Sequence, residues 1–193
     1  QAANNLFPEV DICYVDNMGN DQIGFISSLQ RNTEDTEYIL YAHDKHESKM
    51  RWLDSLLLPF MDRFSLIEHV SEMKSGAGII SSGDSRNKVM SCEEILESHK
   101  YIQHEDRACV VRLVQTLLWL QELQRQFQER FTVVDNNPEH LFPEFTGGTV
   151  FLIRRDIAKM AHSCVHNNFF EENFRPDGNV EHGLERFYYY VSL

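Results

Sequence analysis

Basic residues are scarce in this chain of 193 residues, which has 18 Lys and Arg against 30 Asp and Glu and a formal net charge of −12. Proteins that bind the phosphate backbone of nucleic acid usually carry an excess of positive charge. The composition therefore argues against a nucleic-acid partner. A few local basic groups or backbone donors can still bind a small anion such as a nucleotide.

Cysteine and long apolar runs are also scarce. The four cysteines are spread along the chain without the C-x-x-C spacing of a zinc site, which indicates reduced, structural thiols of a cytoplasmic protein. No stretch approaches the roughly 18 apolar residues of a membrane helix, so no membrane span is expected. The chain opens with Gln1 and shows no signal-peptide segment, which suggests a fragment of a longer protein.

Hydrophobic residues make up 42% of the chain, enough to bury the core of a single domain. The longest predicted helix covers about residues 105–130. Its apolar stripe, at steps of three and four, either packs over a sheet or forms a homodimer face. Further helices are predicted at 50–61, 64–73 and 92–104, short strands at 37–42 and 79–80, and a short strand or extended turn at 131–134.

The segment 145–186 combines glycines, a strand and acidic residues in an order that suggests a ligand site. Gly147 and Gly148 precede an apolar run at 149–153, which predicts a buried strand, and a helix is expected from Asp156. Paired glycines before a strand allow a ligand to approach the backbone closely.

A second helix is expected after the Pro-Asp-Gly turn at 176–178. Its start carries Glu181 and His182, and a carboxylate there could take a proton from a hydroxyl nucleophile. Asp177 is the other candidate base, and Glu181 is favoured because it precedes His182 at a helical position. The structural alternatives are that Asp177 only shapes its turn and that Glu181 only caps its helix.

Two strands nearer the N-terminus are predicted to end in polar loops. The first, at 10–15, leads into a turn from Asn17 to Asp21, where Asp21 can cap the next helix. The second, at 37–42, leads into His43-Asp44-Lys45. Lys45 could offset the charge of a diphosphate directly, or His43 with Asp44 could hold a divalent ion. A solvated charged loop is the alternative that involves no ligand.

These motifs, in this order, resemble the rhamnan-synthesis F family of GT-A-type glycosyltransferases. The residues that carry the resemblance are Asn17, Gly19, Asp21, Phe25, His43, Lys45, Ser48, Gly148, Thr149, Phe151, Arg154, Asp177, Gly178, His182, Leu184, Glu185 and Arg186. GT-A enzymes commonly have an Asp-x-Asp metal motif where this chain has His43-Asp44-Lys45. The resemblance therefore implies either no required cofactor or a Mn²⁺ or Mg²⁺ ion at His43 and Asp44.

The resemblance implies an α/β fold, with a GT-A-like (Rossmann-like) mixed central sheet flanked by helices. Residues 1–193 would form a single catalytic domain that corresponds to the C-terminal two-thirds of a GT-A domain and lacks its N-terminal nucleotide-binding strands. Only about ten residues precede the first predicted strand.

The implied activity is transfer of a sugar, with rhamnosyl transfer as one candidate, from a nucleotide-sugar donor to a glycan or polysaccharide acceptor. Glu181 or Asp177 would be the catalytic base. The implied donor-binding and phosphate-binding residues are Asn17, Asp21, His43, Lys45, Gly147, Gly148, His182 and Arg186. The alternatives are a non-catalytic binding or scaffold protein on a degenerate transferase fold, and a plain α/β interaction module.

Overall fold

The computed structural model describes residues 20–31, 36–42, 56–82, 86–100, 107–133, 137, 140–147, 150–166, 169–170 and 178–193. Its helices are α2 (Asn20–Arg31), α4 (Arg63–Lys74), α5 (Cys92–Ser98), α6 (Arg107–Phe131), α7 (Arg155–Ser163) and α8 (Val180–Val191), with a 3₁₀ turn η2 (Leu58–Phe60). Its strands are β1 (Tyr38–Tyr41), β2 (Ile79–Ser81), β3 (Arg86–Lys88), β4 (Glu144–Thr146) and β5 (Phe151–Arg154). The prediction that helices and strands are combined in one fold is confirmed, whereas the GT-A arrangement stays a prediction.

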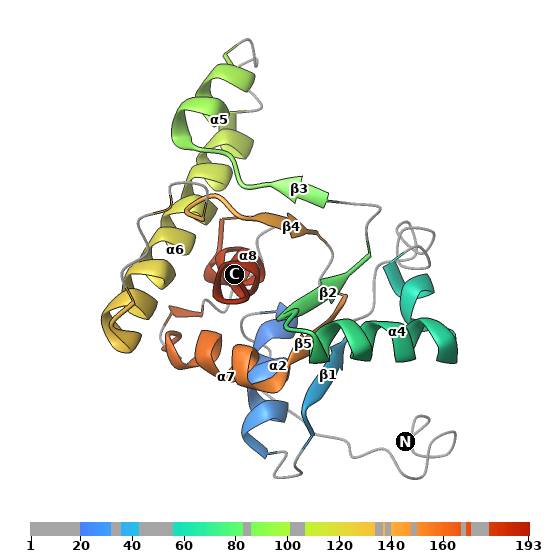
Figure 1. Ribbon diagram of the computed structural model, residues 1–193. Helices are drawn as coiled ribbons and strands as arrows, with labels where there is room; N and C mark the ends of the chain where they lie inside the picture. Colours follow the sequence, from blue (N-terminus) through green and yellow to red (C-terminus); the bar gives the residue numbers. More distant parts are fainter. Residues whose placement is uncertain are drawn as a thin grey trace, which may run out of the picture.

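Strand β5 is the centre of a three-stranded sheet of order β1-β5-β2 (Figure 1). It pairs antiparallel with both neighbours, and Phe151 lies opposite Tyr41 of β1 and Ser81 of β2. Both strand pairs described in this sheet are therefore antiparallel, whereas the predicted mixed sheet would also contain parallel pairs. The last residues of β1 and β2 meet the first residue of β5 at one edge of the sheet.

The two faces of β5 are buried in different apolar clusters. Phe151 and Ile153 face a large cluster that includes residues of α2, α6, α7 and α8. Val150 and Leu152 face a smaller cluster with residues of η2 and α4. This alternation is the period of two that a strand imposes on its side chains, so residues 150–153, the described part of the predicted apolar run, lie between two helical layers.

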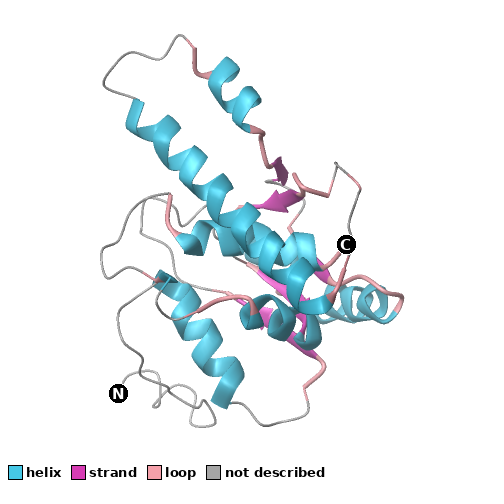
Figure 2. Ribbon diagram, turned by 90° about the vertical axis from the view of Figure 1, so that its left-hand side faces the viewer, coloured by secondary structure: helices cyan, strands magenta, loops and turns pink. Residues whose placement is uncertain are grey.

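Helix α8 lies in the middle of the larger layer, seen end-on in Figure 1 and surrounded by α6, α7 and β4. It packs closely against α6 at Gly183, where an added Cβ would lie only 2.7 Å from Trp119 Cβ. Leu117, Leu120 and Leu123 of the predicted α6 stripe are buried within this chain. The first part of α6 lies beside α5 at one end of the molecule (Figure 1, Figure 2).

Two sequence-based boundaries are wrong for local reasons. The short strand or extended turn predicted at 131–134 is wrong at Phe131, which is the last residue of α6. Thr132 then takes a φ of 54°, and the N–H of Val133 bonds to the carbonyl of Gln128 at 3.1 Å. This is a left-handed helix cap. The helix predicted at 92–104 ends at Ser98, whose hydroxyl bonds to the carbonyl of Ile95 at 3.0 Å.

A chain of buried polar groups joins α7, α8 and α2. Tyr188, fully buried, donates to Gln22 Oε1 at 2.8 Å, and His162 Nε2 lies 2.6 Å from the Tyr188 hydroxyl. Because the tyrosine proton points to Gln22, Nε2 of His162 is the donor to Tyr188. Burial lowers the pKa of His162 to about 3, so the imidazole is neutral at ordinary pH.

Among the helices that the structure describes, none combines the length and the apolar character that are needed to cross a membrane.

Candidate functional site

A cavity of about 390 Å³ lies between the β3–β4 pair, α8 and the first half of α6. This volume is within the usual range for a small-molecule site. It is lined by Asn87, Lys88, Val89, Met90, Ile95, Leu113, Thr116, Leu117, Phe145, Gly147, Glu185 and Arg186. We call it the Arg186 cavity. Its walls are mainly apolar, with the polar and charged groups contributed largely by β3 and by one turn of α8.

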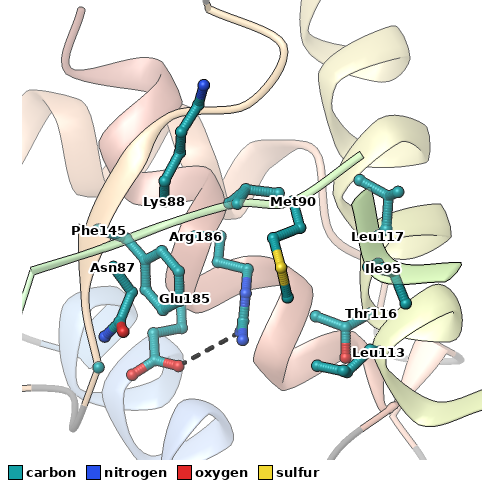
Figure 3. A pocket seen from close by; sticks show the side chains of 12 residues that line it. Asn87, Lys88, Met90, Ile95, Leu113, Thr116, Leu117, Phe145, Glu185 and Arg186 are labelled. Atoms are coloured by element: carbon teal, nitrogen blue, oxygen red, sulfur yellow. Dashed lines mark ion pairs between the residues drawn. The ribbon is translucent and has the colours of Figure 1, made fainter. Parts of the chain in front are cut away.

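Arg186 is held in a fixed orientation at this cavity (Figure 3). Its Nη1 donates to the carbonyl of His182 at 2.5 Å and lies 3.5 Å from Glu185 Oε2. Its guanidinium carbon lies 4.3 Å from the centre of the Phe145 ring, and the side chains of Arg186 and Glu185 are only 13% and 12% exposed. A guanidinium has five N–H donors, so these contacts still leave donors for a ligand.

The pairing of β3 with β4 brings this cavity together from distant parts of the sequence. Asn87 lies opposite Phe145 in the antiparallel pair. Phe145 is 8% exposed and supplies the aromatic face under Arg186, while the ammonium group of Lys88 points away from the guanidinium (Figure 3). The charge beside Phe145 is therefore that of the Arg186–Glu185 pair, with one cation and one carboxylate.

Gly147 borders the cavity next to Asn87. A Cβ added at Gly147 would lie 3.7 Å from Asn87 Nδ2, an ordinary van der Waals distance. The neighbouring protein atoms alone therefore do not require glycine at this position. A glycine that borders a cavity without a steric need for it is suited to close approach of a ligand to the backbone.

The start of α8 is positioned by Gly178, which has a φ of +94° that favours glycine. Its N–H donates to Thr116 Oγ1 at 3.1 Å, and Thr116 also lines the Arg186 cavity. The predicted turn at 176–178 thus has a structural role at Gly178, because it fixes the first turn of α8 against α6.

The structure brings two of the predicted site residues, Gly147 and Arg186, to the same cavity. Glu181 and His182 are not among its lining residues; Glu181 is 4% exposed in the first turn of α8, and His182 contributes its carbonyl to Arg186. Asp21 lies in the first turn of α2. The remaining predicted site residues lie outside the described residues: Asn17, His43, Asp44, Lys45, Gly148 and Asp177.

Several lining residues were not predicted as site residues. Glu185 stands next to Arg186 in the Leu-Glu-Arg sequence, and that adjacency was the signal that could have identified it. Phe145 directly precedes the glycine region. Asn87 and Lys88 gave no signal, because the polar triplet Arg86–Lys88 does not have the composition of a strand.

Within the described ranges, no group of three or more His, Cys, Asp or Glu side chains is placed to hold a metal ion. Because His43 and Asp44 lie outside those ranges, the predicted metal site stays a prediction. Comparison of the chain with models of protein families, with curated proteins and with solved structures found no match.

Proposed function

We propose that this chain is a glycosyltransferase domain and that the Arg186 cavity binds its nucleotide-sugar donor. The observation that carries the proposal is the meeting of Gly147 and Arg186 at one cavity. These residues are 39 positions apart, and the resemblance to the rhamnan-synthesis F family implies that both bind the donor or its phosphates. The Arg186 guanidinium lies over the Phe145 ring, so the site offers a cation for an anionic group beside an apolar aromatic wall for a planar or sugar ring.

The register of the central sheet adds support. Tyr41 and Ser81 are both paired with Phe151, so the chain leaves β1 and β2 at the edge where it enters β5. His43 and Lys45 follow β1 closely in the sequence, and Gly147 precedes β5 closely. Segments that enter or leave a sheet at the same edge are suited to form one ligand site.

In the proposed reaction a carboxylate takes the proton of an acceptor hydroxyl, whose oxygen then forms a bond to the anomeric carbon of the donor sugar. The bond between that carbon and the diphosphate oxygen breaks, and the diphosphate leaves with the electron pair. Arg186 would stabilise the charge of the leaving diphosphate. Glu185, which lines the cavity, joins Glu181 and Asp177 as a candidate base.

One observation favours the second candidate function, a non-catalytic binding protein. Glu181, the base favoured from the sequence, is 4% exposed and is not among the residues that line the Arg186 cavity. A base must come within hydrogen-bond reach of the acceptor hydroxyl. If neither Glu185 nor Asp177 supplies this group, the cavity binds its ligand without catalysing transfer.

Binding is tested by calorimetric titration with UDP, dTDP and GDP, with and without Mn²⁺. We expect Arg186→Gln to weaken binding of the preferred nucleotide at least about tenfold, because a charge-assisted hydrogen bond is lost. Gly147→Ala should also weaken binding while the folded protein accommodates the methyl group. Arg125→Gln is the matched control, since Arg125 lies on the exposed side of α6 in ion pairs with Glu122 and Glu129. Thermal unfolding verifies that each variant is folded.

Failure of all three nucleotides to bind, or equal binding in wild type, Arg186→Gln and Gly147→Ala, would refute the donor site. Catalysis is tested separately by donor consumption in Glu185→Gln, Glu181→Gln and Asp177→Asn. A variant that binds nucleotide normally but no longer consumes donor identifies the base. Binding without donor consumption by the wild type, over a panel of glycan acceptors, would support the non-catalytic alternative.

A further inference from the structure

Helix α6 keeps exposed apolar side chains on its outer side after it has packed against the rest of the chain. Leu117, Leu120 and Leu123 of its predicted stripe are buried within the chain, so they are not available to a partner. Val111 and Leu118, in contrast, are 54% and 55% exposed. The helix runs along the left-hand edge of the molecule in Figure 1, and Figure 2 views the molecule from that side.

The spacing of these residues places them on one face of α6. Val111 and Leu118 are seven residues apart, which is about two helical turns. Arg107 lies four residues before Val111, and Glu122 lies four residues after Leu118, so both charged side chains extend the same face. Arg107 is exposed, and the Glu122 side chain is 36% exposed. The face is therefore apolar in the middle, with a cation at one end and a carboxylate at the other.

The carboxylate end of this face is fixed by hydrogen bonds along the helix. Arg125 donates to Glu122 through Nε at 2.9 Å and through Nη2 at 2.6 Å, and its Nη1 donates to Glu129 at 2.5 Å. Hydrogen bonds from Arg125 and Gln126 lower the pKa of Glu122 to about 2, so this group is ionised at ordinary pH. Two carboxylates share one guanidinium here, which leaves this end of the face negative.

We propose that this face of α6 is a homodimer interface, in which the α6 helices of two copies pack antiparallel with Val111 of each copy against Leu118 of the other. Because Arg107 and Glu122 each lie four residues outside this apolar pair, Arg107 of one copy then comes opposite Glu122 of the other. The contact is isologous, so both the apolar contact and the ion pair occur twice. A parallel pair would instead place each charge opposite its own copy, and like charges across an interface are unfavourable.

The small size of this apolar face indicates a weak, reversible dimer. Interfaces at the lower end of the specific range are typical of transient complexes, so we expect a dissociation constant of about 10–100 μM. The inner side of the same helix carries Leu113, Thr116 and Leu117, which line the Arg186 cavity. The outer face shares none of these residues, so the dimer does not depend on the proposed function of that cavity.

The test is analytical ultracentrifugation of the full chain at protein concentrations from about 1 to 300 μM. We expect a monomer–dimer equilibrium in the wild type. Leu118→Gln should raise the dissociation constant at least about tenfold, because the apolar contact is lost twice in each dimer. Ile67→Gln is the matched control, since Ile67 is 57% exposed on α4 and its substitution should leave the dimer unchanged.

Charge reversal tests the antiparallel register. Arg107→Glu and Glu122→Arg each place like charges opposite one another, so each variant alone should dimerise more weakly than the wild type. In an equal mixture the reversed charges are complementary, so dimers should form again, which also shows that both variants are folded. The proposal is overturned if the wild type is monomeric over the whole range, or if Leu118→Gln dimerises like the wild type. It is also overturned if neither charge reversal weakens the dimer, or if the mixture fails to restore it.

Discussion

The neutral, buried imidazole of His162 predicts a specific dependence of stability on pH. The pKa of this group is about 3 in the folded protein and 6.5 without the fold. Below pH 6.5 the unfolded chain binds a proton at His162 that the folded protein does not bind. The contribution of His162 to the free energy of unfolding is therefore fully present above pH 6.5 and is lost as the pH falls toward 3. The whole effect amounts to about 5 kcal/mol, of which about 1.2 kcal/mol is expected between pH 6 and pH 5.

The perturbation that isolates this effect is His162→Gln. Glutamine does not titrate, and its amide N–H can replace the bond from Nε2 to the Tyr188 hydroxyl. The free energy of unfolding is measured by urea denaturation at pH 7, 6 and 5, with tryptophan fluorescence as the signal. Carboxylates contribute equally to both proteins, so the difference between them reports the histidine alone.

We expect the free energy of unfolding of the wild type to fall between pH 6 and pH 5 by about 1.2 kcal/mol more than that of His162→Gln. The matched control is His166→Gln, which removes an exposed histidine three residues after the end of α7. If the wild type and His162→Gln lose stability in parallel as the pH falls, His162 is not buried in its neutral form, and the description of this polar chain is wrong.

Two further predictions concern backbone packing and capping. Gly183→Ala should destabilise the fold by about 1–3 kcal/mol in urea denaturation, because the added Cβ would lie 2.7 Å from Trp119 Cβ. Gly24→Ala is the control: Gly24 is also within a helix, but an added Cβ there has no atom within 4 Å, so this change should stabilise the fold by about 0.5–1 kcal/mol. Changes of the same sign in both variants would contradict the α6–α8 contact. Asp62→Ala removes the side chain that caps α4 by accepting from the backbone N–H groups of Phe64 and Ser65, and it should lower the free energy of unfolding by about 1 kcal/mol. Asp62→Asn is the conservative control. No loss of stability in Asp62→Ala would show that this cap contributes nothing.

The parts of the fold that depend on local pattern could be predicted from the sequence. The apolar run at 149–153 gave β5, and the stripe along 105–130 gave α6 and its buried face. Both signals come from side chains that repeat with the period of the element. The end of α6 was misplaced because an apolar Phe131 next to β-branched residues is typical of a strand. In the structure Phe131 is the last residue of the helix, and Thr132 forms a left-handed cap.

The candidate site could be predicted only in part. Gly147 and Arg186 were identified because each stands in a motif, but the cavity between them depends on the pairing of Asn87 with Phe145. Pairing between strands that far apart in the chain leaves no local pattern, and the polar triplet of β3 conceals it further.

The two sheets differ in local stability, and it is the β3–β4 pair that contributes strand residues to the wall of the Arg186 cavity. Among the described strands, β5 alone is hydrogen-bonded on both edges, and both of its faces are buried, so it should be among the last segments to exchange its amide protons. The β3–β4 pair has three residues in each strand, and isolated two-stranded pairs are marginal. If the proposed ligand binds in the Arg186 cavity, it would enter and leave by opening of β3 and β4, while α8 keeps Arg186 in place.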